Sequence, residues 1–167
     1  MRIEITKGAR DDAVRIIRGD ASQAYTRFPK KGPVPHDAVH FFVERGLGLK
    51  HAFWGKIAAG AHPEALAAIA KAAGHASATR AGDPYPTIVE LLQAERLVEC
   101  FEAELWGNAG SDDAALIAMA ETACEASRVS LPSLNPDVLA AIRIPMSAFV
   151  ATWCVAPQGF VAVLDWD

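Results

Sequence analysis

The final residues of the chain, Gly159 to Asp167 (GFVAVLDWD), read as one β-strand that follows a long stretch of helical periodicity. A single strand leaves its backbone N–H and C=O groups unpaired, so it needs a sheet to join. The N-terminal residues, up to about position 30, are the one other part of the sequence with strand character. This feature therefore predicts that the two ends of the chain meet in one sheet.

The N-terminal residues predict an antiparallel meander of three short strands. RIEIT alternates strictly, with Ile3 and Ile5 on one face and polar side chains on the other. Turns at residues 8–12 and at 19–20 separate this strand from AVRIIR and then from SQAYTRF. Because the alternate face is polar, we expect only one side of the sheet to be covered.

After the loop PKKGPVP, apolar residues recur at helical spacing. Helices are predicted at 36–46, 50–60, 63–73, 86–106, 112–128, 136–142 and 146–154. Pro63, Pro86 and Pro136 suit the first turn of a helix, where no N–H is needed. We expect an α+β fold in which a small antiparallel sheet, formed by the N-terminal meander and the C-terminal strand, packs on a layer of about six helices.

The length and composition are those of one soluble globular domain. The chain has 167 residues, of which 51% are hydrophobic and 22% charged. We expect a single domain over residues 1–167, with the meander in 1–30, the mainly helical part in 36–154 and the closing strand in 159–166. The net charge of −4 argues against a nucleic-acid partner, which calls for a basic face, and against docking on anionic lipid.

The cysteine pattern and the N-terminal residues indicate the cellular compartment of the protein. Cys100, Cys124 and Cys154 are far apart and form no C-x-x-C pair, so we expect buried, inert thiols in a reducing compartment. The stretch MRIEITKGARDDAVR has charges where a secretory signal would be apolar. These features predict a cytoplasmic protein.

One uncharged stretch, Ile144 to Leu164, has the length of a membrane span. Pro145 and the turn at 157–159 divide it, which predicts a short buried helix followed by a buried strand. We therefore expect no membrane partner.

The segment Pro33 to Gly46 (PVPHDAVHFFVERG) carries the residues best suited to chemistry. As a helix it places His36, His40 and Glu44 within about 80° of one another, with Asp37 beside them. Two imidazoles at positions i and i+4 can bind one divalent ion, as in H-E-x-x-H zinc sites, and Asp37 stands where that motif has its general base. Zinc, iron and nickel all accept imidazole, so the sequence does not select among them.

Three interpretations of this cluster stay open. As a metal site it needs a third ligand, which Glu44, His62, His51 or a carboxylate of another helix would supply. As structure alone, Asp37 favours the positive end of the helix and His40 bonds a neighbouring strand at the edge of the core. As a metal-free site, the same side chains bind a ligand or exchange protons.

A second candidate lies on the predicted helix at 86–106. Glu95, Glu99 and Glu102 form a carboxylate stripe there, which is typical of a solvated helix face. The alternatives are that they reach toward the histidine helix as ligands, or pair with arginines across a dimer interface. The E-x-x-H signature of di-iron bundles is absent from this helix.

A third candidate, residues 46–62, sets His51, Phe53 and Trp54 between glycines. Glycines beside aromatic residues let backbones approach closely, which favours core packing, and a pocket wall is the alternative.

The sequence has no phosphate-binding loop, nucleophile elbow, kinase signature, EF-hand or cysteine zinc motif. The large well-marked enzyme classes are thereby set aside.

The stretches PHDAVHFFVERGLGL and FWGKIAAG resemble a family of uncharacterised bacterial proteins. That family shares a Pro-His-Asp-x-x-His helix start after N-terminal strands, and a tryptophan helix, a Pro/Gly turn and one more strand at the end, similar to ATWCVAPQGFVAVLDWD here. The resemblance covers residues 33–60 and the C-terminal tail. It implies this order of elements and brings no activity or catalytic role.

Our first interpretation is a bacterial protein that works by binding, either to itself as a homo-oligomer or to a small molecule. Its binding patch would comprise His36, Asp37, His40, Glu44, His51 and Trp54. An exposed apolar patch, or a dimer seam along the helix at 86–106, would support this interpretation. The alternative is a divalent-metal-dependent hydrolase with His36 and His40 as ligands, Glu44 or His62 completing the shell, and Asp37 orienting a ligand or the attacking water.

Overall fold

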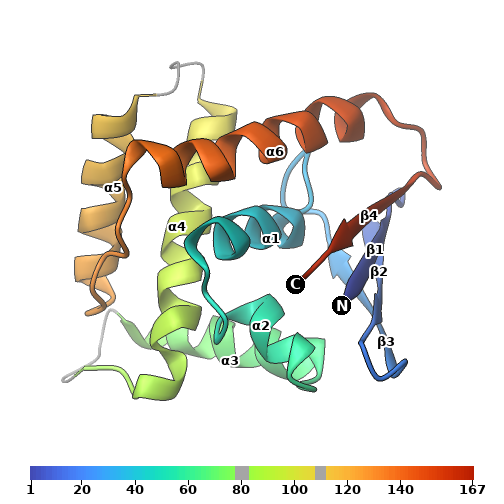
Figure 1. Cartoon of the computed structure of the whole chain (residues 1–167), viewed down its shortest axis with the longest axis horizontal. Coiled ribbons are helices and arrows are strands. Elements are labelled where there is room, and N and C mark those ends of the chain that lie inside the picture. Colours follow the sequence, from blue (N-terminus) through green and yellow to red (C-terminus); the bar gives the residue numbers. More distant parts are fainter. Residues whose placement is uncertain (78–82, 108–111) are drawn as a thin grey trace.

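The computed structural model describes residues 1–77, 83–107 and 112–167, with the backbone alone for 70–71 and 73–77. One antiparallel sheet has the strand order β3-β2-β1-β4, formed by β1 Arg2–Thr6, β2 Asp11–Ile17, β3 Gln23–Pro29 and β4 Val161–Asp165. Helices cover one side of this sheet (Figure 1). The predicted α+β fold is confirmed, including the junction of the C-terminal strand with the N-terminal meander.

β4 pairs with β1 over its whole length, and Ile3 stands opposite Leu164. Both side chains are buried in the core. Beyond the paired residues, the N-terminal amino group of Met1 donates to the carbonyl oxygen of Trp166 at 2.6 Å, and the backbone N–H of Trp166 donates back to the carbonyl oxygen of Met1 at 2.8 Å. The two ends of the chain are therefore tied together by hydrogen bonds.

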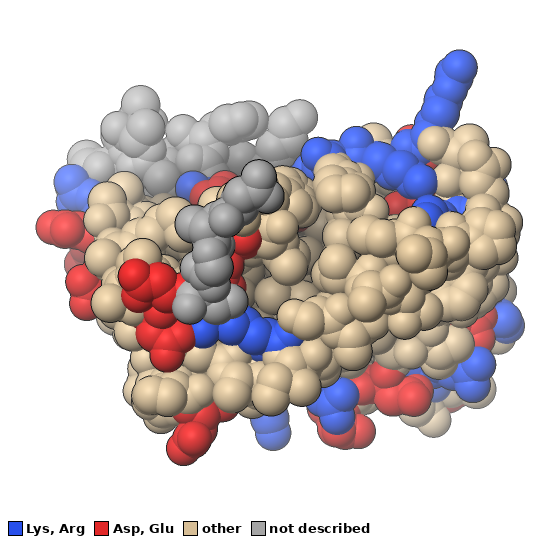
Figure 2. Space-filling view, turned by 90° about the horizontal axis from the view of Figure 1, so that it is seen from above, with Lys and Arg blue, Asp and Glu red and all other residues tan. Residues whose placement is uncertain are grey.

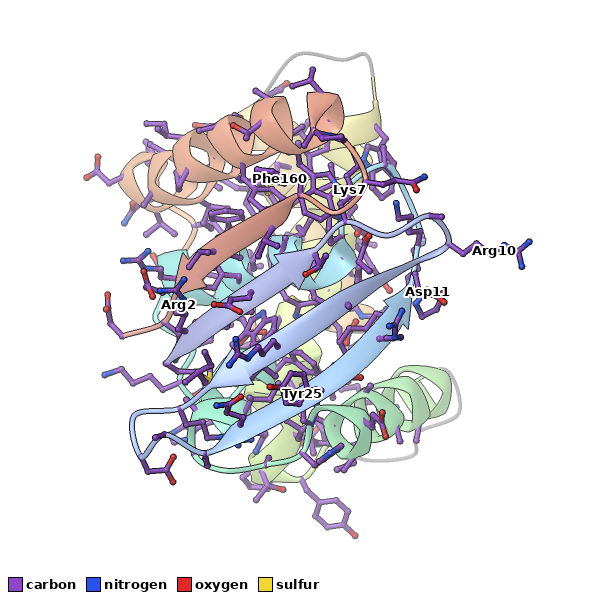
Figure 3. The ribbon with its side chains drawn as sticks, turned by 90° about the vertical axis from the view of Figure 1, so that its right-hand side faces the viewer. Arg2, Lys7, Arg10, Asp11, Tyr25 and Phe160 are labelled. Atoms are coloured by element: carbon purple, nitrogen blue, oxygen red, sulfur yellow. The ribbon has the colours of Figure 1, made fainter. Side chains whose placement is uncertain are left out.

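The other face of the sheet carries charged residues together with the exposed Val161 and Val163, and no helix covers it in the part of the chain that the structure describes (Figure 3). Arg2 and Arg15 both pair with Glu4 there, at 3.0 and 3.3 Å. Tyr25 on β3 is 62% exposed on the same face. The strict alternation of β1 thus separates a buried face from a solvated one, as the sequence predicts.

The described helices are α1 His36–Leu47, α2 Phe53–Ala58, α3 Pro63–Ser77, α4 Val89–Trp106, α5 Asp113–Ala126 and α6 Pro136–Val155, with a 3₁₀ turn, η1 Pro86–Ile88, ahead of α4. α1 lies in the middle, and α2, α4 and α6 pack against it (Figure 1). Residues 38–44 are all buried. Gly46 lets α6 approach, because a Cβ at this position would lie 2.3 Å from Cγ1 of Ile142. The polar side chains of α1 must therefore find partners inside the protein.

α6 differs from the prediction. We expected Pro145 to divide residues 136–154 into two short helices, but one unbroken helix continues through it. A proline inside a helix removes one backbone hydrogen bond. Ile142, Met146 and Trp153 are buried on the same helix, and their packing against the core outweighs that loss.

Within the described residues, α6 is the one helix long and apolar enough to cross a membrane, and only 22% of its apolar stretch is buried. Its inner side chains belong to the core, but most of the helix is exposed, so the expectation of a buried helix in this stretch is wrong. Cys154 lies on the outer side and is exposed, whereas Cys100 and Cys124 are buried. The expectation of three buried thiols is therefore wrong for Cys154, because this residue faces away from the core.

Candidate metal centre

The site begins where α1 begins. Pro35 precedes the helix in an extended conformation, and no side chain caps the first turn. His36 is the first helical residue and His40 follows one turn later, so the two rings lie side by side with centroids 4.8 Å apart. His40 is buried, whereas the side chain of His36 is 15% exposed.

α4 supplies two carboxylates that face these rings. Glu95 and Glu102 are two helical turns apart, so they share the face of α4 that packs on α1. Oε1 of Glu102 lies 2.9 Å from Nδ1 of His36. Glu95 reaches both rings: its Oε2 lies 3.8 Å from Nε2 of His36, and its Oε1 lies 3.6 Å from Nε2 of His40.

The hydrogen bonds determine which nitrogen of each ring carries a proton. Nδ1 of His40 lies 3.0 Å from Oε1 of Glu44, and Nδ1 of His36 lies against Glu102. An ionised carboxylate only accepts hydrogen bonds, so both Nδ1 atoms donate. A neutral ring then has its lone pair on Nε2, and both Nε2 atoms face Glu95. Such an arrangement needs a positive charge in between, either a second proton on each ring or a bound cation.

The distances around Glu95 leave space for a cation between its carboxylate and the two rings. Separations of 3.6 and 3.8 Å are longer than an ordinary N–H···O hydrogen bond. One nitrogen of each ring and one oxygen of Glu95 lie within 4.8 Å of one another. A tetrahedral zinc ion, with bonds of about 2.0–2.2 Å, holds its ligand atoms roughly 3.3 Å apart, so the widest separation in this group has to shorten when an ion binds. Two histidines and one carboxylate are also the ligand set of open zinc and non-haem iron sites.

Glu44 holds His40 from the opposite side of its ring. This carboxylate is fully buried, and its Oε2 accepts the backbone N–H of Trp54 at 2.9 Å. Burial raises the pKa of Glu44, and the neighbouring His40 acts in the opposite direction. A buried carboxylate needs partners at both oxygens, and α1 and α2 each provide one. Glu44 therefore orients His40, which is the role of the outer carboxylate in metal-bound histidines.

When no ion is bound, protonated His36 and His40 supply the positive charge beside the carboxylates of the site. Burial alone would lower the pKa of His40, but the hydrogen bond with Glu44 and the nearby charge of Glu95 raise it to about 10. Burial likewise opposes protonation of His36, and Glu102 and Glu95 still raise its pKa. Burial would raise the pKa of Glu95, but the two histidines hold this pKa well below the usual range. Protons on the two rings then take the place of a cation.

The structure places the other predicted residues around this centre or away from it. Asp37 interacts electrostatically with both rings; burial raises its pKa, and the nearby positive charges, including Lys31, act against this. Trp54 is fully buried and its Nε1–H donates to the carbonyl oxygen of Asp37 at 2.9 Å, so it supports α1 rather than lining an open wall. His51 and His62 are exposed and are not part of the metal-ligand group.

The third ligand of the group is Glu95, which the sequence favoured as part of a solvated stripe. The alternative was that these carboxylates reach toward the histidine helix, and Glu95 and Glu102 do lie against its histidines. The available signal was the seven-residue spacing of these two carboxylates beside a strongly apolar arc. The spacing does not say which helix the stripe will face, because that depends on how α4 packs.

The outer edge of the site reaches solvent at Glu99, whose Oε2 pairs with Nη1 of Arg96 at 2.9 Å. Glu99 lies one turn from Glu95 and is 51% exposed, whereas Glu95 itself is 19% exposed. On the face seen from above, most Lys, Arg, Asp and Glu side chains lie around the periphery (Figure 2). The side chains of Glu95 and His36 keep some exposed surface, through which a small ion can reach them.

No protein-family model, curated protein or solved structure matches this chain.

Proposed function

We propose that this protein is a divalent-metal-dependent hydrolase whose ligands are His36, His40 and Glu95. The observation that carries the proposal is the arrangement of the two rings, each with Nδ1 held by a carboxylate and Nε2 turned toward Glu95. Three protein ligands leave a coordination position open, and zinc in such a site lowers the pKa of bound water to about 7. Zinc, iron and nickel are all candidates.

The cluster supports this function better than a structural role. A buried His–carboxylate pair contributes little net stability, because the desolvation of both groups offsets their attraction. Three carboxylates directed at two histidines exceed what a helix start requires. The proposal also includes a small-molecule substrate and a cytoplasmic location, in line with the composition of the sequence.

The decisive experiment measures metal content of the untagged protein by mass spectrometry, followed by calorimetric titration with Zn²⁺, Fe²⁺ and Ni²⁺ under reducing conditions. We expect about one ion per chain, and loss of that ion in His40→Ala and Glu95→Gln. Glu99→Gln is the matched control, because it removes a neighbouring carboxylate outside the ligand group and should leave binding unchanged. If the wild type binds none of the three metals, the proposal is wrong.

Hydrolysis is tested separately on the metal-loaded protein. A panel of chromogenic esters, phosphoesters and amides should reveal an activity that a chelator removes and the metal restores. Stoichiometric metal binding with no turnover on any substrate class would support a metal-binding protein and contradict the hydrolase.

A further inference from the structure

Pro145 leaves one backbone acceptor of α6 without its helical partner. Inside a helix, each N–H donates to the carbonyl oxygen four residues earlier, and proline has no N–H. The acceptor that loses its donor is the carbonyl oxygen of Ala141, an exposed residue. The packing of α6 explains why the helix tolerates this loss, but it does not explain the proline, because alanine would keep both the helix and the hydrogen bond.

Ala141 and Pro145 both line a hollow between α1 and α6, about 260 Å³ in volume. Phe42, Arg45 and Gly46 of α1 complete its lining. Pockets for drug-sized ligands have volumes of about 300–1,000 Å³, so this hollow suits a smaller molecule. We call it the α1–α6 hollow.

Arg45 gives the α1–α6 hollow a positive charge. Its Cζ lies 5.8 Å from the centroid of the Phe41 ring. Its Nη2 donates to Oδ2 of Asp167 at 3.1 Å, and the two side chains are 54% and 86% exposed, so this surface ion pair is weak. A guanidinium has five N–H donors, so Arg45 can also bind a carboxylate in the hollow.

A ligand that matches these groups carries a carboxylate, a hydrogen-bond donor next to it and an apolar body. The carboxylate pairs with Arg45, the donor pairs with the carbonyl oxygen of Ala141, and the apolar body packs on Phe42 and Pro145. The negative charge of Asp167 beside Arg45 favours an ammonium group as the donor.

We propose that the α1–α6 hollow binds a free α-amino acid with an apolar side chain. The carboxylate of the amino acid lies on Arg45 and its ammonium group on the carbonyl oxygen of Ala141. None of the lining residues belongs to the metal-ligand group, so this proposal does not depend on the proposed metal site.

The first test is a nuclear magnetic resonance titration of the isotope-labelled, metal-free protein with leucine. We expect saturable shifts of the amide signals of Gly46 and Ala141, with a dissociation constant in the millimolar range, because the site is small and open. Isocaproate lacks the amino group of leucine and isoamylamine lacks its carboxylate, so each should bind about tenfold more weakly. If leucine produces no saturable shifts at these residues, or binds no better than either analogue, the proposal is overturned.

The second test, Pro145→Ala, removes the unpaired acceptor. The new N–H donates to the carbonyl oxygen of Ala141, so leucine should bind this variant about tenfold more weakly, while the free energy of unfolding rises. A folding defect cannot produce that combination. Pro157→Ala is the matched control, because Pro157 is exposed and lies outside the lining of the hollow. Wild-type affinity for leucine in Pro145→Ala would show that this acceptor does not bind the ligand and would refute the proposal.

The third test locates the carboxylate. Arg45→Gln should weaken the binding of leucine about tenfold and leave that of isoamylamine unchanged, whereas Lys50→Gln, which alters an exposed lysine outside the hollow, should change neither. His40→Ala should bind leucine as the wild type does. Loss of leucine binding in His40→Ala, with unchanged binding in Arg45→Gln, would place the amino acid at the metal centre and overturn the proposal.

Discussion

The carboxylate of Glu44 bridges two helices: its Oε1 lies 3.0 Å from Nδ1 of His40, and its Oε2 accepts the backbone N–H of Trp54 at 2.9 Å. His40 is thereby held with Nε2 toward Glu95, 3.6 Å away on α4. A fully buried carboxylate thus links the start of α2 to the proposed metal ligands.

Glu44→Gln should weaken metal binding by 10- to 100-fold, because the outer carboxylate orients the ligating ring and increases its basicity. The amide keeps the shape of the side chain but cannot accept both hydrogen bonds as well. Calorimetric titration with Zn²⁺ measures the change, and Glu99→Gln serves as the control. Unchanged affinity in Glu44→Gln would remove the positioning role of this residue.

The stability of the metal-free protein should depend on pH through His40. Its pKa is raised from 6.5 to about 10 by Glu44 and Glu95 against the effect of burial. Because the pKa is higher in the folded state, this contribution is complete below pH 6.5 and is lost as the pH rises toward 10. The pKa of Glu95 is lowered, so its contribution is present above pH 4.5 and is lost at lower pH.

We therefore expect the unfolding free energy contributed by this cluster to be greatest between pH 4.5 and 6.5 and to fall by pH 9.5. Urea denaturation at pH 5.5, 7.5 and 9.5 measures it, and a His40→Ala, Glu95→Gln double variant should lose most of this dependence. The affinity for metal should rise over the same range, since binding displaces the ring protons. An affinity independent of pH would contradict ligation by these rings.

Lys7 should stabilise the end of α6. Its Nζ donates to the carbonyl oxygens of Trp153 at 2.7 Å and Ala156 at 2.8 Å, and it lies 5.6 Å from the Trp153 ring (Figure 3). A cation at a helix C-terminus is favourable, so Lys7→Met should lower the free energy of unfolding by about 1–2 kcal/mol. The exposed Lys50→Met is the control, and equal effects of the two changes would refute the capping role.

Gly46→Ala should destabilise the fold, because the added methyl would lie 2.3 Å from Cγ1 of Ile142. Overpacking of this kind costs about 1–3 kcal/mol. Gly19→Ala is the matched control, since nothing lies within 4 Å of its Cβ position. Adding Ile142→Ala to Gly46→Ala should recover part of the loss due to the clash, and strictly additive effects in urea denaturation would argue against direct contact.

Thiol reactivity should distinguish the three cysteines. Cys154 is exposed and should react rapidly with a disulfide reagent, whereas Cys100 and Cys124 are buried and should react only after unfolding. Burial also raises the pKa of Cys100 to about 11, which keeps its thiol protonated. Cys154→Ser should abolish the fast phase, and two fast-reacting thiols in the native protein would contradict the packing of α4 on α5.

The sequence alone determined the sheet and most helix positions. Alternation of Ile3 and Ile5 with polar residues, and the isolated terminal strand GFVAVLDWD, lead to one four-stranded sheet because unpaired strands cannot satisfy their backbone groups. The i, i+4 spacing likewise placed His36 and His40 on one helix face. These are local consequences of backbone geometry, which the order of residues is enough to define.

Tertiary structure decided the rest. Pro145 predicted a break, but burial of Met146 and Trp153 keeps α6 continuous. Glu95 looked like part of a solvated stripe, and it became the third member of the site only because α4 packs on α1. The sequence around Glu95 does not indicate that this residue contacts the histidines. The contact arises from the packing of apolar faces elsewhere on the two helices.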